Sequence, residues 1–451
     1  MTLQEWVQKN QKAKRYAHFD KRVSLKKILT YISEPDNISH HGFYPFIHYT
    51  KVFNKYSNGK IKKKERELNY SAHIDRYIYS YYGFLLNQKY NDRVFQDGLN
   101  DVSLAYRDNL GKNNIHFAKS AVDKIREIGK CYIIVGDFTN FFDQLDHKYL
   151  KDMLCDLLQV KLLPDDYYAV FKNITKYSKW ELIDILNYYG LAVNEKGIKE
   201  LNEKHVVFTL KEFKRLKKID QNNPKPNKNN YGIPQGSAIS AVLSNIYMLK
   251  CDKILNDYVK KYNGLYMRYS DDFIIVLPKI TEDVFKDQFQ YINTTIKSIP
   301  YLILQPDKTQ VFCYTDTCLI SCNTLVMPDI QNRQNRINYL GFTFDGKEVT
   351  IRDKTITKYY YRMYRKLKTI VKNNGITKNG NRISCENVYY KYSSKGARII
   401  KENGQQKNRG NFITYVQRAE KIWGPEEPIN RSTKNHLLKI RRQLDKLKQN
   451  G

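Results

Sequence analysis

Acidic residues stand at critical points of two apolar runs in this sequence. The run YIIVGDF (132–138) carries Asp137 near its end, and the run YMRYSDDFIIVL (266–277) carries Asp271 and Asp272 at its centre. The first run predicts a buried strand, and the second predicts two strands joined by a tight turn with Asp271 at its tip. Carboxylates at the ends of adjacent strands can hold a pair of Mg²⁺ ions about 3.5–4 Å apart, which suits phosphoryl transfer.

These acids are far apart in the chain, so only the fold can bring them together, and each alone also fits an ordinary turn or helix-capping residue. Three patterns in series favour the catalytic interpretation: DFTNFFD (137–143), GIPQGSAIS (232–240) and YSDD (269–272). Together they resemble the central palm motifs of reverse transcriptases, in the same order. The resemblance implies an α+β right-hand polymerase with fingers, a palm built on an antiparallel sheet flanked by helices, and a helical thumb. It implies an enzyme, an RNA-directed DNA polymerase.

The same resemblance implies a metal centre. Asp137 and Asp271 would bind both ions, the carbonyl of Phe138 would be a further ligand, and Asp272 would assist. The implied cofactor is two Mg²⁺ ions, with Mn²⁺ as an alternative. Cys313, Cys318 and Cys322 lack a fourth ligand at a suitable spacing, so we do not expect a zinc site.

Other residues match positions that contact the incoming nucleotide and the template in this family. Phe142 matches an aromatic steric gate, whose ring would press on C2′ of the sugar and favour dNTP over NTP. Gln235 and Gly236 would approach the nascent base pair. Lys308, in QPDKTQVF (305–312), matches the proposed general acid for pyrophosphate. A core phenylalanine, a helix-entry turn and a solvated lysine remain the plainer interpretations.

The resemblance extends into the preceding segment. RELNYSAHIDR (66–76) is similar to a fingers segment of group II intron and related bacterial enzymes, which implies that Arg66 and Arg76 lie near the triphosphate. LAYRDNLGKNNIHFA resembles the next fingers motif and offers Arg107 as a phosphate or template contact. YLGF (339–342) resembles the primer grip.

We therefore predict four regions. These are an N-terminal extension (1–60), fingers (61–131), a palm (132–345) with fingers insertions around 151–230, and a basic helical thumb or C-terminal region (346–451). The segment INYLGFTF (337–344) has the pattern of a strand.

The composition favours a nucleic-acid partner. The chain has 77 Lys and Arg against 46 Asp and Glu, a net charge of +31, together with 37 Tyr that can stack on bases. No signal peptide and no run of about 18 apolar residues is visible, so we expect a cytoplasmic protein without membrane contact. Oligomerisation remains open.

We find none of the retron signatures, no nuclease after the thumb, and no integrase or RNase H segment. This favours a stand-alone bacterial enzyme of the unknown-group or abortive-infection kind, active in antiphage defence. The expected partners are dNTPs, a DNA primer or product, and an RNA template, in particular a cognate non-coding RNA. Template-independent or protein-primed synthesis, an RNA-dependent RNA polymerase and a non-catalytic RNA-binding scaffold are the alternatives. Phe142 argues against the second of these, and the intact acids against the third.

Overall fold

A computed structural model describes most of the chain. The described residues are 1–57, 60–219, 223–332, 334–373, 386–396, 398–402 and 405–449.

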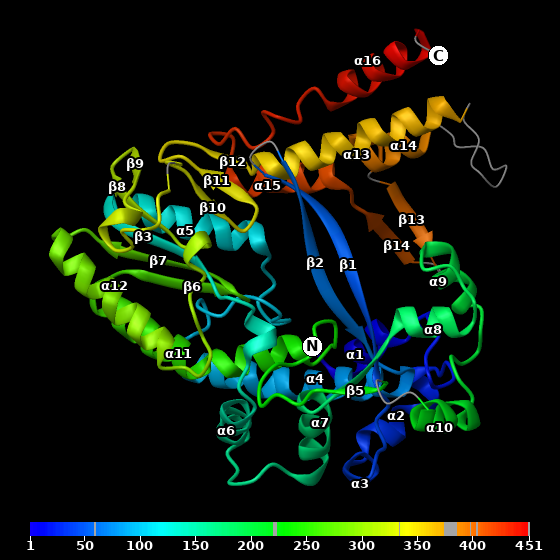
Figure 1. The fold of residues 1–451 in the computed structure, drawn as a ribbon. Coiled ribbons are helices and arrows are strands. Elements are labelled where there is room, and N and C mark those ends of the chain that lie inside the picture. The colour runs from blue at the N-terminus through cyan, green and yellow to red at the C-terminus, as the bar shows by residue number, and fades with distance from the viewer. Residues whose placement is uncertain are drawn as a thin grey trace.

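A five-stranded antiparallel sheet has the strand order β6-β7-β3-β8-β9 and lies on the left of the view in Figure 1. Its middle strand, β3, is the predicted YIIVGDF strand. Successive β3 residues point to opposite faces, so Ile134 lies in one hydrophobic core and Ile133 and Val135 lie in another. Because both faces are covered, the strand is apolar at nearly every position. The strands are β3 (Lys130–Asp137), β6 (Leu265–Tyr269), β7 (Asp272–Pro278), β8 (Gln310–Thr315) and β9 (Cys318–Ser321).

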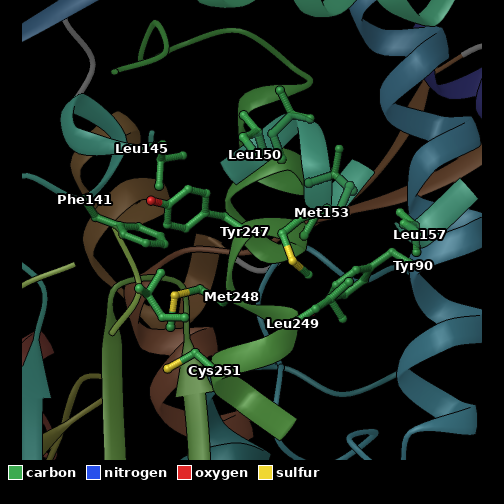
Figure 2. Packing of buried hydrophobic residues seen from close by; sticks show 14 of the residues in the cluster. Tyr90, Phe141, Leu145, Leu150, Met153, Leu157, Tyr247, Met248, Leu249 and Cys251 are labelled. Atoms are coloured by element: carbon green, nitrogen blue, oxygen red, sulfur yellow. The ribbon is translucent and has the colours of Figure 1, made fainter. Parts of the chain in front are cut away.

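A layer of helices lies over the first face of this sheet: α11 packs on β6 and β7, α4 and α6 pack on α11, and α7 packs on α4. The central one, α11, follows the GIPQGSAIS pattern and buries residues on most of its circumference, as expected for a helix enclosed on several sides. Figure 2 shows Tyr247, Met248 and Leu249 of α11 packed among side chains of α4, α6 and the loop after β3. These helices are α4 (His73–Gln96), α6 (His147–Leu158), α7 (Asp165–Thr175), α11 (Ser240–Lys261) and α12 (Glu282–Lys297).

The second core connects the other face of the sheet to the C-terminal region. The predicted strand INYLGFTF is in fact a hairpin, because Leu340 and Gly341 both have positive φ and turn the chain between β10 and β11. The strand β12 pairs with β11, so this small sheet continues past residue 345, where we had placed the end of the palm. The elements here are α5 (Asn114–Ile128), β10 (Ile337–Tyr339), β11 (Phe342–Phe344), β12 (Val349–Ile351), α13 (Asp353–Lys372), α14 (Glu386–Tyr392), β13 (Arg398–Glu402), β14 (Gln405–Arg409), α15 (Phe412–Trp423) and α16 (His436–Gln449).

A long β-hairpin, β1 and β2, extends away from the N-terminal helices (Figure 1). Its two strands pair along their whole length, although we had assigned β1 to an N-terminal extension and nearly all of β2 to the fingers. Backbone pairing and not composition therefore decides how these segments group. The remaining elements of this region are α1 (Leu3–Asn10), α2 (Leu25–Ser33), α3 (Pro35–Ser39), β1 (Phe46–Ser57), β2 (Lys60–Tyr70), β4 (Ser178–Glu181), α8 (Leu182–Tyr188), α9 (Glu195–Leu201), α10 (Leu210–Ile219) and β5 (Lys225–Pro226).

The N-terminal segment is attached to the helix α4. The carboxylate of Asp20 accepts hydrogen bonds of 2.9 Å from the backbone amides of both His73 and Ile74, at the first turn of α4. Such an acceptor satisfies amides that have no partner within the helix, and its negative charge is stabilised by the positive end of the helix dipole. Antiparallel sheets with helices packed on them confirm the predicted α+β class. Among the described residues, no helix is both long and apolar enough to cross a membrane.

Candidate active site

The predicted acids lie at the same end of two neighbouring strands of the five-stranded sheet. The strand β3 ends at Asp137, and in the register with β7 this residue lies directly opposite Asp272. Asp271 lies in the turn between β6 and β7, after Ser270, whose φ is +63°. Pairing of adjacent strands thus brings together backbone positions that are far apart in the sequence.

Asp137 and Asp271 open onto a cleft of about 560 Å³. This volume is typical of small-molecule sites, which span about 300–1,000 Å³. Its walls come from β2, the loop after β3, the loop before α11, the turn before β7 and the segment before β8. The lining residues are Lys64, Glu65, Arg66, Glu67, Leu68, Tyr106, Asp137, Phe138, Asn140, Phe141, Phe142, Asp143, Gln235, Gly236, Ser237, Ser240, Ala241, Ser270, Asp271 and Lys308.

Burial, and then the crowding of like charges, raise the pKa values of Asp137 and Asp272. Burial raises the pKa of Asp137, against the hydrogen bond from Lys308, and the charge of Asp271 raises it further. Burial together with the charges of Asp271 and Asp137 raises the pKa of Asp272 to about 6. Among the described residues that line the cleft, Asp272 is not found, and the nearby Arg352 acts to lower its pKa.

Asp137 has one satisfied and one unsatisfied oxygen. Lys308 Nζ lies 2.6 Å from Asp137 Oδ2, whereas the buried Oδ1 accepts no hydrogen bond from any described residue. Leaving a buried acceptor without a partner costs about 1–3 kcal/mol. A hydrated divalent cation would satisfy this oxygen, since Mg²⁺ prefers carboxylate oxygens and keeps several waters.

The carboxylate oxygens of Asp137 and Asp271 therefore fit Mg²⁺, although protein side chains would supply only some of its ligands. In the described part of the chain, no group of three or more His, Cys, Asp or Glu side chains is arranged to hold a metal ion by itself. Carboxylates of Asp137 and Asp271 would leave the remaining positions to water and substrate phosphates, which is how Mg²⁺ is commonly bound in nucleotide-processing enzymes.

The loop before α11 is joined to the end of β2. The amide of Asn69 donates to the carbonyl of Gln235 at 3.0 Å, and Gln235 Nε2 donates to both oxygens of Asp143 at 3.2 and 3.1 Å. A Cβ on Gly236 would lie 2.5 Å from the carbonyl oxygen of Asn69, and its φ is +112°. We expected glycine here for close approach to a base pair. The structure shows a requirement within the chain itself, because the backbone of Asn69 occupies the space that a side chain would need.

Two predicted phosphate-binding arginines lie outside the cleft. Arg107 donates to Asn91 Oδ1, to the carbonyl and side chain of Asn100, and to the carbonyl of Ser103, at 2.6–3.2 Å. Arg76 lies over the ring of Tyr77 at 3.9 Å, and its Nε and Nη2 are buried without a hydrogen-bond partner in the described residues. Neither lines the cleft among the residues described, so the structure does not bring them together with the acids. Arg107 instead holds its own loop.

Sequence reasoning missed several residues of the cleft. Tyr106 lines it beside the predicted Arg107, has a φ of +63°, and its hydroxyl lies 3.0 Å from Ser270 Oγ. Asp143 stands within DFTNFFD, yet its bond to Gln235 joins two motifs that no spacing rule connects. Burial raises the pKa of Asp143, against the hydrogen bond from Gln235. No pattern in the sequence announces a positive φ at a tyrosine.

The fold and the cleft define a right-hand polymerase: an antiparallel sheet carries an acidic pair, helices cover it, and a basic hairpin forms one wall. The reverse transcriptase (RNA-dependent DNA polymerase) family profile matches residues 85–344, which is more than half of the chain. The chain belongs to this family. The family is described as that of RNA-dependent DNA polymerases, which are nucleotidyltransferases.

Solved structures that are similar to the chain include two telomerases. Apo telomerase from Candida tropicalis, truncated from its C-terminal domain, has a TM-score of 0.41 at 12% identity, over 67% of this chain and 54% of that one. Telomerase from Candida albicans with a fragment of telomeric RNA has a TM-score of 0.41 at 14% identity, over 92% and 58%. The chain thus spans less than two thirds of these telomerase chains. The comparison with curated proteins found no match.

Proposed function

We propose that this protein synthesises DNA on an RNA template, adding dNTPs to a 3′-hydroxyl by two-metal phosphoryl transfer. The observation that carries the proposal is the pairing of Asp137 with the Asp271 turn at one cleft, with a buried Asp137 oxygen that has no partner. Family membership supplies the reaction class.

In this proposal Asp137 and Asp271 hold Mg²⁺ or Mn²⁺ ions, with the carbonyl of Phe138 as a further ligand. When bound, the ions neutralise charge on the attacking and leaving oxygens. Asp272 contributes negative charge beside them. Lys308, whose ammonium already lies at Asp137, would donate a proton to the leaving pyrophosphate. Positioning supplies the rest, since phosphoryl transfer asks little covalent chemistry of side chains.

The cleft walls would select and orient the nucleotide. Arg66, on β2, faces the cleft and offers a guanidinium fork for phosphate oxygens. The ring of Phe142 would press on C2′ of the sugar and exclude a 2′-hydroxyl. Gln235, fixed by Asp143, would support the nascent base pair. Arg76 and Arg107 have no role in this scheme.

We assign the fingers to about 61–131 together with the β1 strand, the palm to 132–351, which ends with β12, and the thumb to 352–451. The N-terminal extension is then the part before β1. As to biology, we propose a bacterial, cytoplasmic enzyme of antiphage defence that copies a cognate non-coding RNA. The net charge of +31 supports a nucleic-acid partner.

The test is incorporation of labelled dNTPs by the purified protein, with and without candidate RNA. We expect incorporation that depends on Mg²⁺ and on RNA. Asp271→Ala should abolish synthesis and keep RNA affinity, whereas Asp307→Ala, an exposed acid beside Lys308, should keep both. Incorporation that survives RNase would favour template-independent or protein-primed synthesis. Preference for NTPs would favour an RNA polymerase, and RNA binding without synthesis would favour a scaffold.

A further inference from the structure

The turn that carries Asp271 has a backbone conformation that side chains rarely adopt. Ser270 has a φ of +63° and is only 5% exposed. A non-glycine residue stays in this left-handed region only when its surroundings hold it there. Ser270 immediately precedes Asp271, so whatever fixes Ser270 also sets where the Asp271 carboxylate stands.

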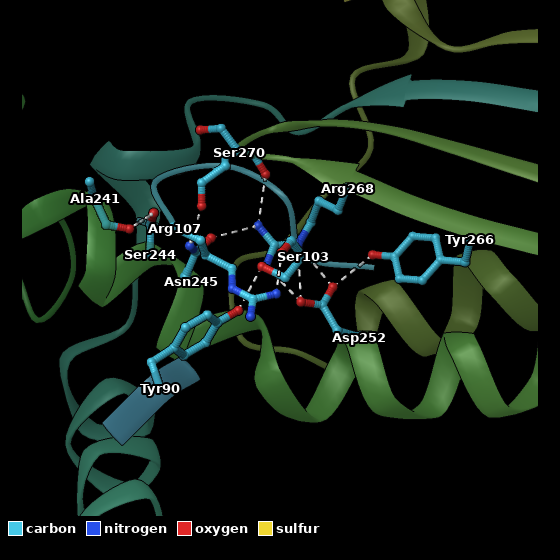
Figure 3. A network of polar contacts seen from close by, with 11 residues as sticks. Tyr90, Ser103, Arg107, Ala241, Ser244, Asn245, Asp252, Tyr266, Arg268 and Ser270 are labelled. Carbon is cyan, nitrogen blue, oxygen red and sulfur yellow. Dashed lines mark hydrogen bonds and ion pairs between the residues drawn. The ribbon is translucent and has the colours of Figure 1, made fainter. Parts of the chain in front are cut away.

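Arg268 holds this turn through a hydrogen bond to its backbone. Its side chain is fully buried, and Nη1 donates to the carbonyl of Ser270 at 3.0 Å (Figure 3). Nη1 also donates to Asn245 Oδ1 at 3.2 Å, and Nη2 donates to Ser103 Oγ at 3.2 Å. Against Asp252, Nε lies 2.9 Å from Oδ1 and Nη2 lies 2.6 Å from Oδ2.

Every N–H of this guanidinium therefore has an acceptor. Arginine has five such donors in a rigid fork, and lysine has three on a flexible stem. Asp252 on α11 is itself fully buried, and its Oδ1 also accepts from the hydroxyl of Tyr266 at 2.8 Å. A buried ion pair is often no more stabilising than an apolar pair of the same volume. What an apolar pair cannot supply is the directed donor to the Ser270 carbonyl.

A second connection reaches the turn from the loop before α5. Arg268 forms a parallel bridge with Ser103, in which its amide donates to the carbonyl of Val102 at 2.7 Å. Asn245 of α11 donates to the carbonyl of Ala105 at 2.9 Å. The next residue, Tyr106, places its hydroxyl 3.0 Å from Ser270 Oγ. The loop and the helix thus meet at the same serine from two directions.

We propose that Asp252, Arg268 and Tyr106 are positioning residues that fix the Ser270 turn and thereby aim Asp271 into the cleft. Neither Asp252 nor Arg268 lines the cleft, so these two residues act only through the turn. The inference rests on the proposed function for its kinetic consequence. Its structural part, that two connections fix the Ser270 turn, can be tested on the protein without substrate.

The main test compares Arg268→Lys with a matched control, Arg126→Lys. Arg126 also pairs with a buried carboxylate, Glu427, at 2.7 Å and also donates to a backbone carbonyl, that of Lys347, at 2.8 Å, but it lies away from the cleft. Two readouts are measured: amide hydrogen exchange at residues 269–272 without any substrate, and single-turnover dNTP incorporation with its dependence on dNTP concentration.

For Arg268→Lys we expect faster exchange at 269–272 and a maximal rate about 100-fold lower, since a misplacement of about 1 Å has an effect of that size. The half-saturating dNTP concentration should change little, because the nucleotide-facing walls are intact. Arg126→Lys should leave both readouts as in the wild type. Comparison of the two variants separates misplacement of the Asp271 carboxylate from the loss of stability that any buried Arg→Lys change can cause.

Tyr106→Phe keeps the proposal testable if Arg268→Lys does not fold. It removes one hydroxyl from a side chain that is 47% exposed, and we expect faster exchange at the turn and a rate about two- to tenfold lower. Tyr415→Phe, which loses a hydroxyl bonded to Asn114 at 3.0 Å, is its control. Unchanged exchange at 269–272 in the folded variants would overturn the positioning role. If the wild type incorporates no dNTP, the proposed function fails while the exchange result still decides this inference.

Discussion

The ammonium of Lys308 and a bound metal ion would compete for the carboxylate of Asp137. The Lys308 ammonium lies 2.6 Å from Asp137 Oδ2, with 53% of the lysine side chain and 15% of the aspartate side chain exposed. We predict that Lys308→Met strengthens divalent-metal binding in the absence of nucleotide, because the metal no longer has to displace an ammonium. Methionine keeps an unbranched apolar stem, so the change is chiefly one of charge.

The exposure of the pair sets the expected size. Ion pairs open to water contribute about 0.2–1 kcal/mol, and the partial burial of Asp137 favours the upper end. About 1 kcal/mol corresponds to roughly a fivefold lower dissociation constant. The rate of incorporation should move the other way, down by about 100-fold, if the ammonium also donates the proton to pyrophosphate.

The assay is Mn²⁺ binding to the protein alone, followed by electron paramagnetic resonance, with single-turnover incorporation measured in parallel. Lys279→Met is the matched control, because it removes the same charge at a site away from Asp137. Lys279 follows the C-terminal end of β7, whereas the acids lie at its N-terminal end, and its ammonium lies over the ring of Tyr132. The Mn²⁺ affinity of this variant should equal that of the wild type. Weaker or unchanged Mn²⁺ binding by Lys308→Met would refute the competition argument.

Three further predictions concern the cleft and its surroundings. Phe142→Val should raise ribonucleotide use relative to dNTP by about 10- to 200-fold in kcat/KM, and an unchanged ratio would exclude Phe142 as the gate. Since the pKa of Asp272 is raised to about 6 from an ordinary value of about 3.9, the folded protein retains a proton that the unfolded chain has lost between these values. The stability of the metal-free protein should therefore fall as pH rises through this window; Asp272→Asn should flatten the trend in Tm measured with EDTA, and a rise with pH would contradict it. Arg107→Ala loses four hydrogen bonds and should lower the free energy of unfolding by about 1–3 kcal/mol in a denaturant titration. RNA affinity should stay within about twofold, given that typical phosphate contacts contribute more, and a large loss of affinity at unchanged stability would restore the original expectation.

The sequence was sufficient where one element carries its own signal. The apolar run before Asp137 and the paired runs around Asp271 predicted β3 and the β6–β7 hairpin, and the shared sheet then followed from the family resemblance. Local patterns of this kind depend on residues that are neighbours in the chain. They survive in the folded protein because burial on both faces demands apolar side chains at each position.

Prediction failed where the deciding partner lies elsewhere in the chain. Arg107 and Tyr106 are adjacent, yet Tyr106, whose φ is positive, lines the cleft, whereas Arg107 is held in its own loop by Asn91, Asn100 and Ser103. The reason for Gly236 is a carbonyl at Asn69, far away in sequence. Arg268 is a single basic letter before YSDD, and nothing nearby announces that Asp252 neutralises it. These features depend on backbone angles and distant contacts, which spacing does not encode.

The strand β3 belongs to two hydrophobic cores at once, with Ile134 on one side and Ile133 on the other. A volume change in either core presses on the same backbone, and Asp137 is its last residue. Interiors packed at crystal-like density transmit such strain instead of absorbing it. Repacking the C-terminal core for thermal stability should therefore alter catalysis unless a compensating change is made across the strand, so selection for activity after such engineering should return second-site mutations on the α11 side.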